Sequence, residues 1–148
     1  MAQLRQDYQQ FVNRDAEILI VGPDDQKAFV EYWEKIPLWD SQQSLPRTTK
    51  EALHKQRIQN NPIGLANSLK GMGTGVQPSL WNTLSTIQLP VHLIVGELDT
   101  KFVSIAQDMH TYLPESNLHV VTDAGHTAHL EQPEAFNETL VKILNANL

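Results

Sequence analysis

Apolar positions recur at helical spacing in the first part of the chain. The run DDQKAFVEYWEKI predicts a helix that is capped by one of the aspartates at 24 and 25 and ends at Pro37. In TTKEALHKQRIQNN, a threonine at 48 or 49 and Glu51 form a capping-box pattern, which predicts a second helix before Pro62. PIGLANSLKGMG and QPSLWNTLSTI predict two shorter helical segments. The N-terminal stretch predicts a helix through about residue 14, whereas EILIV at 17–21 fits either a helix or a strand.

The pattern changes after the sequence TIQLP. VHLIV at 91–95 and NLHVV at 117–121 are short β-branched apolar runs, and each predicts a buried strand. FVSIAQDMHTYL lies between them and has helical spacing, as does the segment that follows Pro133. The predicted inward face of that last helix consists of Phe136, Leu140, Ile143 and Leu144. Strand, helix, strand and helix in this order predict a βαβα unit with parallel strands.

These two patterns predict two regions, a helical region over residues 1–88 and the βαβα unit over residues 89–148. A parallel pair of strands is buried on both faces and needs further strands beside it. The chain offers no convincing run for those strands. The sequence therefore predicts part of a larger α/β fold.

Composition and charge narrow the function classes. The formal net charge is −6, and all of it arises after residue 88, where two basic residues face eight acidic ones. An acidic chain without a basic run is a poor nucleic-acid ligand. No apolar stretch approaches the roughly 20 residues of a membrane span, and the N-terminus lacks the apolar core of a signal peptide. The absence of cysteine excludes disulfides and a thiol nucleophile, and a cytoplasmic location is expected.

Two residues with catalytic chemistry follow the two predicted strands. Asp99 comes three residues after Gly96, and His126 comes directly after the sequence DAG. In open α/β sheets, ligands bind beyond the carboxyl ends of the strands, and the loops of neighbouring strands lie side by side there. A carboxylate that accepts the Nδ1 proton of a histidine leaves Nε2 to take a proton from a serine. Taken singly, the aspartate also fits a turn or cap residue, and the histidine a surface or core residue.

The other candidates for chemistry are weaker. His129 lies three residues after His126, but no third metal ligand of suitable type is near in the sequence. The remaining histidines are expected in the core or on the surface. No serine has glycine two residues before and two after it, so the G-x-S-x-G nucleophile elbow is absent. GMGTG at 71–75 follows no strand and lacks the lysine of a phosphate-binding loop. The usual order serine, aspartate, histidine would place the serine before Met1.

The runs VHLIVGELDTKF and DAGHTAHLEQPEAFNETL resemble the last two strands and triad loops of the α/β-hydrolases. With YWEKIPLW and RIQNNPIGLANSLKGMGTGVQPSLW, the chain as a whole resembles the 2-succinyl-6-hydroxy-2,4-cyclohexadiene-1-carboxylate (SHCHC) synthases of the menaquinone pathway. The resemblance implies a partial α/β-hydrolase fold, in which a helical lid precedes the last βαβα unit of the core. The nucleophile, the oxyanion-hole loop and the first six strands have no counterpart in the chain.

The resemblance also implies an activity. It implies the elimination of pyruvate from a polycarboxylate cyclohexene by proton abstraction, with a Ser-His-Asp triad and no cofactor. Asp99 and His126 match the triad acid and the triad histidine. The arginines and aromatic residues that match substrate-binding positions are Arg57, less securely Arg5, and Tyr32, Trp33 and Trp39. The guanidinium fork of an arginine suits a substrate that carries several carboxylates.

Two alternatives stay open. The reaction could be that of an esterase or a C–C bond hydrolase with the same fold. The chain could instead be a non-catalytic module that works through an exposed sheet edge. Without a nucleophile and an oxyanion hole, this polypeptide alone is expected to be inactive. It is expected to associate with itself or to pair with the missing N-terminal half, and neither nucleic acid nor a membrane is an expected partner.

Overall fold

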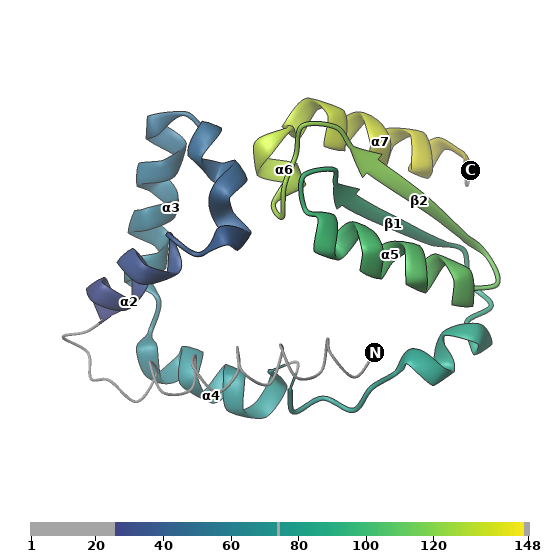
Figure 1. Cartoon of the computed structure of the whole chain (residues 1–148), viewed down its shortest axis with the longest axis horizontal. Helices are drawn as coiled ribbons and strands as arrows, with labels where there is room; N and C mark the ends of the chain where they lie inside the picture. The colour runs from purple at the N-terminus through teal and green to yellow at the C-terminus, as the bar shows by residue number, and fades with distance from the viewer. Residues whose placement is uncertain (1–25, 74, 147–148) are drawn as a thin grey trace. The chain divides into compact units, whose positions relative to one another are not determined.

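The computed structural model describes residues 26–73 and 75–146 (Figure 1). The chain forms two compact units, which are described separately. The first unit comprises Met1–Lys35 and Arg47–Ser79, and the second comprises Ile36–Pro46 and Leu80–Leu148. The predicted boundary between residues 88 and 89 does not coincide with this division, because residues 36–46 and 80–88 belong to the unit that contains the strands. The division into a lid over residues 1–88 and a core segment over residues 89–148 stays a prediction.

The first unit contains helices α2 (Gln26–Trp33), α3 (Arg47–Gln59) and α4 (Pro62–Met72). The predicted helix before Pro37 is present, but it ends at Trp33 and leaves a turn before the proline. The aspartates proposed as its cap lie outside the described residues, as do the predicted helix through residue 14 and the run EILIV. The Gln26 amide donates a hydrogen bond to the carbonyl of Asn60 and so ties the start of α2 to the end of α3.

The predicted threonine cap of α3 is wrong. The helix begins at Arg47, directly after Pro46, so both threonines lie within its first turn. Glu51 does not reach back to the cap, because its carboxylate accepts a hydrogen bond from Arg47 Nε at 2.6 Å. Helix α4 begins with a better-matched cap, since Asn61 Oδ1 accepts the Gly64 N–H at 2.9 Å and Pro62 occupies the first helical position.

The second unit contains the parallel strand pair that the sequence predicts. Strand β1 (Val91–Gly96) pairs with β2 (Ser116–Val121) in a register that sets Val91 opposite Ser116 and Gly96 opposite Val121. Helix α5 (Thr100–Tyr112) connects the strands, and α7 (Pro133–Ala146) follows them. In Figure 1 the two strands lie between α5 and α7. Within the described ranges, these two strands are the whole sheet.

A small apolar cluster lies where β2 ends. Val121, Ala124 and Ala128 are buried there, and Ile94 and Phe136 pack against them. Phe136 therefore faces inward, as predicted. Leu144 does not, because 64% of its surface is exposed.

Three short elements complete the second unit. They are the 3₁₀ helices η2 (Pro37–Ser44) and η3 (Trp81–Thr86) and the single-turn helix α6 (Ala128–Glu131). The sequence predicts η3 as a helical segment, and its Leu84 is buried. Neither η2 nor α6 was predicted. Both lie beside the loop that carries His126, so they matter for the site.

No helix within residues 26–73 and 75–146 combines the length and the apolar character that crossing a membrane requires.

Candidate active site

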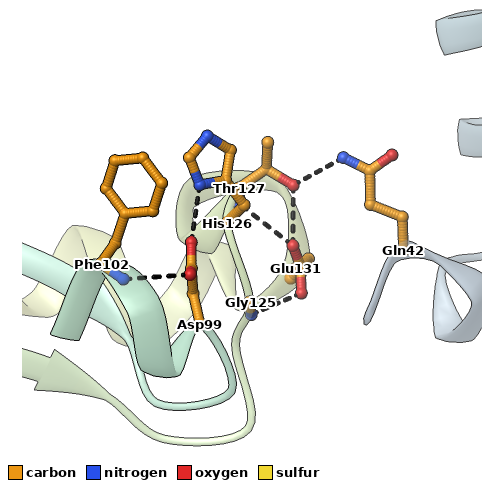
Figure 2. A network of polar contacts seen from close by, with 7 residues as sticks. All are labelled: Gln42, Asp99, Phe102, Gly125, His126, Thr127 and Glu131. Carbon is orange, nitrogen blue, oxygen red and sulfur yellow. Dashed lines mark hydrogen bonds and ion pairs between the residues drawn. The ribbon is translucent and has the colours of Figure 1, made fainter. Parts of the chain in front are cut away.

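Asp99 and His126 lie in direct contact. The Nδ1 atom of His126 is 2.6 Å from Oδ2 of Asp99 (Figure 2). The aspartate side chain is 9% exposed and the histidine side chain is 28% exposed. A short contact between a nearly buried carboxylate and an imidazole nitrogen fixes the Nδ1 tautomer, because the carboxylate can only accept. The Asp99–His126 contact is the one that the two strand ends predict.

The position of Asp99 follows from the end of β1. Asp99 is the N-cap of α5, and its Oδ1 accepts the N–H of Phe102 at 3.2 Å. One oxygen therefore satisfies the helix terminus while the other holds the histidine. An aspartate at this position meets both needs, since a cap requires a side-chain acceptor and the histidine requires a second one.

The loops that follow the two strands are joined by backbone contacts. The Glu97 N–H donates to the Val121 carbonyl at 2.9 Å, and the Leu98 N–H donates to the Ala124 carbonyl at 2.8 Å. Gly96 permits this approach, because a Cβ at its position would lie 2.1 Å from the Gly125 carbonyl oxygen. The two loops thus form one hydrogen-bonded platform for Asp99 and His126.

Two aromatic rings hold the imidazole of His126. The Phe102 ring centre is 4.6 Å from it, and the Trp39 ring centre is 5.4 Å from it in an edge-on arrangement. In Figure 2 the Nε2 corner of the ring points away from Asp99. No hydrogen bond joins Nε2 to any serine hydroxyl of the chain within residues 26–146, and Ser41 is engaged elsewhere. Nε2 is therefore the atom that can exchange a proton with a group outside the described site.

The loop around His126 is held by Glu131, which the sequence reasoning did not single out. Its Oε2 accepts the N–H of Gly125 at 2.6 Å. Its Oε1 accepts both the N–H of Thr127 at 3.0 Å and the Thr127 hydroxyl at 2.7 Å. A glutamate four residues after a threonine was a readable signal for such a contact, although it lies one position beyond the usual capping box.

The pKa of Glu131 reflects these contacts. Burial by itself raises it, but the hydrogen bonds outweigh burial and hold the pKa below its usual value. The donors are the Thr127 hydroxyl, the Gly125 N–H, the Ser41 hydroxyl and the Thr127 N–H. Each donor favours the ionised form. Glu131 is therefore a carboxylate at neutral pH.

Helix η2 contributes three residues to this region. Besides the Trp39 ring and the Ser41 hydroxyl, the buried Gln42 donates its amide N–H to the Thr127 hydroxyl at 2.9 Å. Trp39 was expected on the wall of a substrate pocket, and the structure places it against the imidazole. Ser41 and Gln42 were not predicted, because their contacts join residues that are some 85 positions apart in the sequence.

The other residues expected to bind substrate lie in the first unit. Arg57 Nη1 is 2.9 Å from Glu34 Oε1, and His54 Nδ1 is 2.9 Å from the other oxygen of the same carboxylate. Trp33 stacks on Phe29 with a ring separation of 5.9 Å. Tyr32 is half-exposed. Arg5 lies outside the described residues. Their role in binding stays a prediction.

Within the described residues, this pair is part of neither a metal centre nor the surface hollow beside α7. His129 packs edge-on against Phe136, and within the described ranges no three potential ligands come together for a metal ion. A hollow of about 400 Å³ lies between the strands and α7, lined by His92, Asn117, His119, Thr139, Lys142, Ile143 and Ala146. None of these residues touches Asp99 or His126.

Known proteins resemble the chain both in sequence and in structure. A Bacillus subtilis (strain 168) protein provisionally named SHCHC synthase is 50% identical over 123 residues, which are 83% of this chain and 45% of that protein. SHCHC synthases of Salmonella typhimurium and Salmonella paratyphi B are each 34% identical over 112 residues, which are 76% of this chain and 41% of theirs. The chain is a relative of the SHCHC synthases.

The structural comparison agrees. MenH from S. aureus, an α/β-hydrolase, matches with a TM-score of 0.90 and 31% identity, over 99% of this chain and 54% of that chain. This match confirms the predicted partial α/β-hydrolase fold. The chain spans less than half of the SHCHC synthases that it matches and about half of MenH. No family model matches the chain.

Proposed function

We propose that the chain supplies the acid–base pair and the lid of an SHCHC synthase-like enzyme that eliminates pyruvate from a polycarboxylate cyclohexene. The observation that carries the proposal is the 2.6 Å contact between His126 Nδ1 and Asp99 Oδ2, with Nε2 turned away from it (Figure 2). In a catalytic triad, a pair with this geometry accepts a proton and stabilises the resulting charge. The relationship to the SHCHC synthases supports the choice of reaction.

The proposed roles follow from the geometry. His126 accepts the proton of a serine hydroxyl at Nε2, and the serine oxygen takes a proton from a substrate carbon. The electrons of that C–H bond form a C=C bond while the bond to the departing group breaks. The imidazolium then gives its proton to the departing group, which leaves as pyruvate, so that the serine hydroxyl and the neutral histidine are restored. Asp99 stabilises the imidazolium through its contact with Nδ1. We propose that the serine comes from a segment outside the chain. By the same reasoning the chain alone is inactive.

The proposed substrate carries carboxylates, and Arg57 is the proposed binding group, with Arg5 as a second. The Arg57 guanidinium already contacts Glu34 at 2.9 Å. An arginine presents five donors in a planar fork, so it can hold a protein carboxylate and a substrate carboxylate together. Glu34 would then fix the direction of the fork. Tyr32, Trp33 and Trp39 are proposed as aromatic residues that bind the substrate.

The proposal is tested with a chimaera in which this chain replaces the matching segment of the Bacillus subtilis relative. We expect the chimaera to release pyruvate from the polycarboxylate substrate and the isolated chain to release none. Pyruvate is measured by a coupled assay, and folding of both proteins is checked by circular dichroism. A folded chimaera without activity would refute the proposed reaction. An active isolated chain would refute the proposal that the serine comes from outside the chain.

The rival reaction is the hydrolysis of an ester or of a C–C bond, which the α/β-hydrolase fold alone also permits. Arg57→Ala in the chimaera separates the two. Loss of a charged hydrogen bond costs about 1–3 kcal/mol, which is about 5- to 150-fold in kcat/KM for the carboxylate substrate. Arg47→Ala is the matched control, because Arg47 lies in the same helix with its side chain 90% exposed. If Arg57→Ala and Arg47→Ala lowered kcat/KM equally, the result would favour a hydrolase that acts on neutral substrates.

The remaining expectations are part of the proposal. The partner of the chain is a second copy or the missing half of the fold, with contact through the open edge of β1. Neither nucleic acid nor a membrane is a proposed partner, and the proposed location is the cytoplasm. A non-catalytic role in self-association is the second candidate, and the open sheet edge favours it.

A further inference from the structure

The backbone on both sides of His126 is bound by a single side chain. The N–H of Gly125 and the N–H of Thr127 both point to the Glu131 carboxylate, one to each oxygen, at 2.6 and 3.0 Å. The Thr127 hydroxyl adds a third donor at 2.7 Å (Figure 2). The residue between these two peptide groups is the one whose imidazole meets Asp99.

This arrangement restricts the imidazole where Asp99 cannot. A hydrogen bond at Nδ1 fixes one atom of the ring but leaves the ring free to pivot about that atom. The direction of the Cα–Cβ bond of His126 depends on the backbone, and the backbone is set by the two bound neighbours. Glu131 and Asp99 therefore fix the two ends of the same side chain.

Helix η2 reaches the same carboxylate. The Ser41 hydroxyl donates to Glu131, and Gly125 provides the space for it, because a Cβ on Gly125 would lie 2.0 Å from Ser41 Oγ. The buried Gln42 holds the Thr127 hydroxyl from the other side. The donors around Glu131 thus come from η2 and from the His126 loop, and their number keeps the carboxylate ionised.

We propose that Glu131 is a positioning residue for His126, which acts by binding the peptide N–H groups on both sides of it and not by touching the substrate. This inference rests on the proposed function, since positioning matters for catalysis only if His126 is the triad histidine. The physical basis is preorganisation. A base that is held in its reactive direction reacts faster than one that must find that direction in each turnover.

The first test uses the chain itself and needs no activity. Nuclear magnetic resonance follows the His126 Nδ1 proton, which the short contact to Asp99 shifts far downfield, and the exchange of the Gly125 and Thr127 amides. Glu131→Gln keeps the size of the side chain but replaces one acceptor oxygen by a donor. We expect exchange of all three protons to become faster by about tenfold or more. Glu134→Gln, which changes an exposed carboxylate three residues away, is expected to change none of them.

Unchanged exchange in a folded Glu131→Gln protein would overturn the proposal. Should that variant fail to fold, Glu131→Asp takes its place. It keeps the charge but is one methylene too short to span both N–H groups, and we expect faster exchange of at least one amide together with the Nδ1 proton. Unchanged exchange in that variant would overturn the proposal equally.

The second test uses the active chimaera. Glu131→Gln is expected to lower kcat by about 10- to 100-fold, with KM within about twofold, because substrate contacts are untouched. A rise in KM at constant kcat would overturn the positioning role. An inactive wild-type chimaera would refute the proposed function but not the exchange result, so the two failures are distinguishable.

Discussion

At the scale of single residues, Asp99 makes both a local contact and a long-range contact. Its two oxygens have separate tasks, since Oδ1 caps α5 and Oδ2 holds His126. Asn is about as good an N-cap as Asp, but its neutral amide accepts a weaker hydrogen bond from the Nδ1–H of His126 than a carboxylate does. The two tasks can therefore be separated by a single substitution.

Asp99→Asn should leave stability nearly unchanged and remove most of the activity. We expect the free energy of unfolding in urea to change by less than about 1 kcal/mol. Pyruvate release by the chimaera should fall by about 10⁴-fold, as expected when the wrong histidine tautomer is favoured. A large loss of stability with a small loss of activity would show that the capping role is the main one.

Glu131 makes the stability of the site depend on pH. Its pKa is lowered in the folded chain, so its contribution is complete above the unfolded pKa and is lost as pH falls through the folded pKa. The urea stability of the wild-type chain and of Glu131→Gln, measured between pH 7 and pH 3, should therefore converge in acid. A stability difference that stays constant over this range would contradict the ionised carboxylate.

The sequence predicted the residues that follow strand ends and missed those that support them. Asp99 and His126 were found because each comes a few positions after an apolar β-branched run. Gln42 and Ser41 could not be found, because nothing in the local pattern of η2 indicates which distant loop they contact. Glu131 could have been found from its spacing to Thr127.

At the scale of elements, the joined loops after β1 and β2 are the feature that brings Asp99 and His126 together. The contact between Asp99 and His126 could be predicted from the assumption that the two strands are parallel neighbours. The pairing of β1 with β2 confirms that assumption. The terminal helix was predicted because its apolar spacing is long and regular. Helix η2 was missed because eight residues of 3₁₀ helix carry no clear 3.6-residue period.

Gly96→Ala tests the close approach of these loops. A Cβ there would lie 2.1 Å from one carbonyl oxygen and 2.4 Å from that of Ala124. Two backbone segments must shift to relieve such contacts. We therefore expect the free energy of unfolding in urea to fall by about 1–3 kcal/mol and the downfield signal of the His126 Nδ1 proton to disappear. Gly71→Ala is the matched control. Nothing lies within 4 Å of its Cβ, and its place in α4 predicts a gain of about 0.5–1 kcal/mol.

At the scale of the whole molecule, the second unit leaves apolar surface around its strand pair exposed. Large apolar side chains remain open to solvent on β2 and α7, including Val120 at 47%, Val141 at 55% and Leu144 at 64%. Two parallel strands and a small core are marginal by themselves. From the sequence it could be predicted only that this pair needs further strands beside it, because a parallel pair buried on both faces is marginal alone.

We therefore expect the isolated chain to self-associate. Size-exclusion chromatography with light scattering should give a mass at or above that of a dimer at micromolar concentration, and hydrogen exchange should show protection of the outer β1 amides that increases with concentration. A folded monomer with unprotected β1 amides would contradict this prediction. Such a result would also remove the support for a non-catalytic role of the edge.

The most direct test of the account compares His126→Asn with His129→Asn in the chimaera. The two histidines are three residues apart, and only the first contacts Asp99. The account predicts that His126→Asn lowers kcat for pyruvate release by about 10⁴-fold or more, and that His129→Asn stays within about threefold of the wild-type chimaera. Comparable activity in the two variants would contradict the assignment of Asp99 and His126 as the acid–base pair.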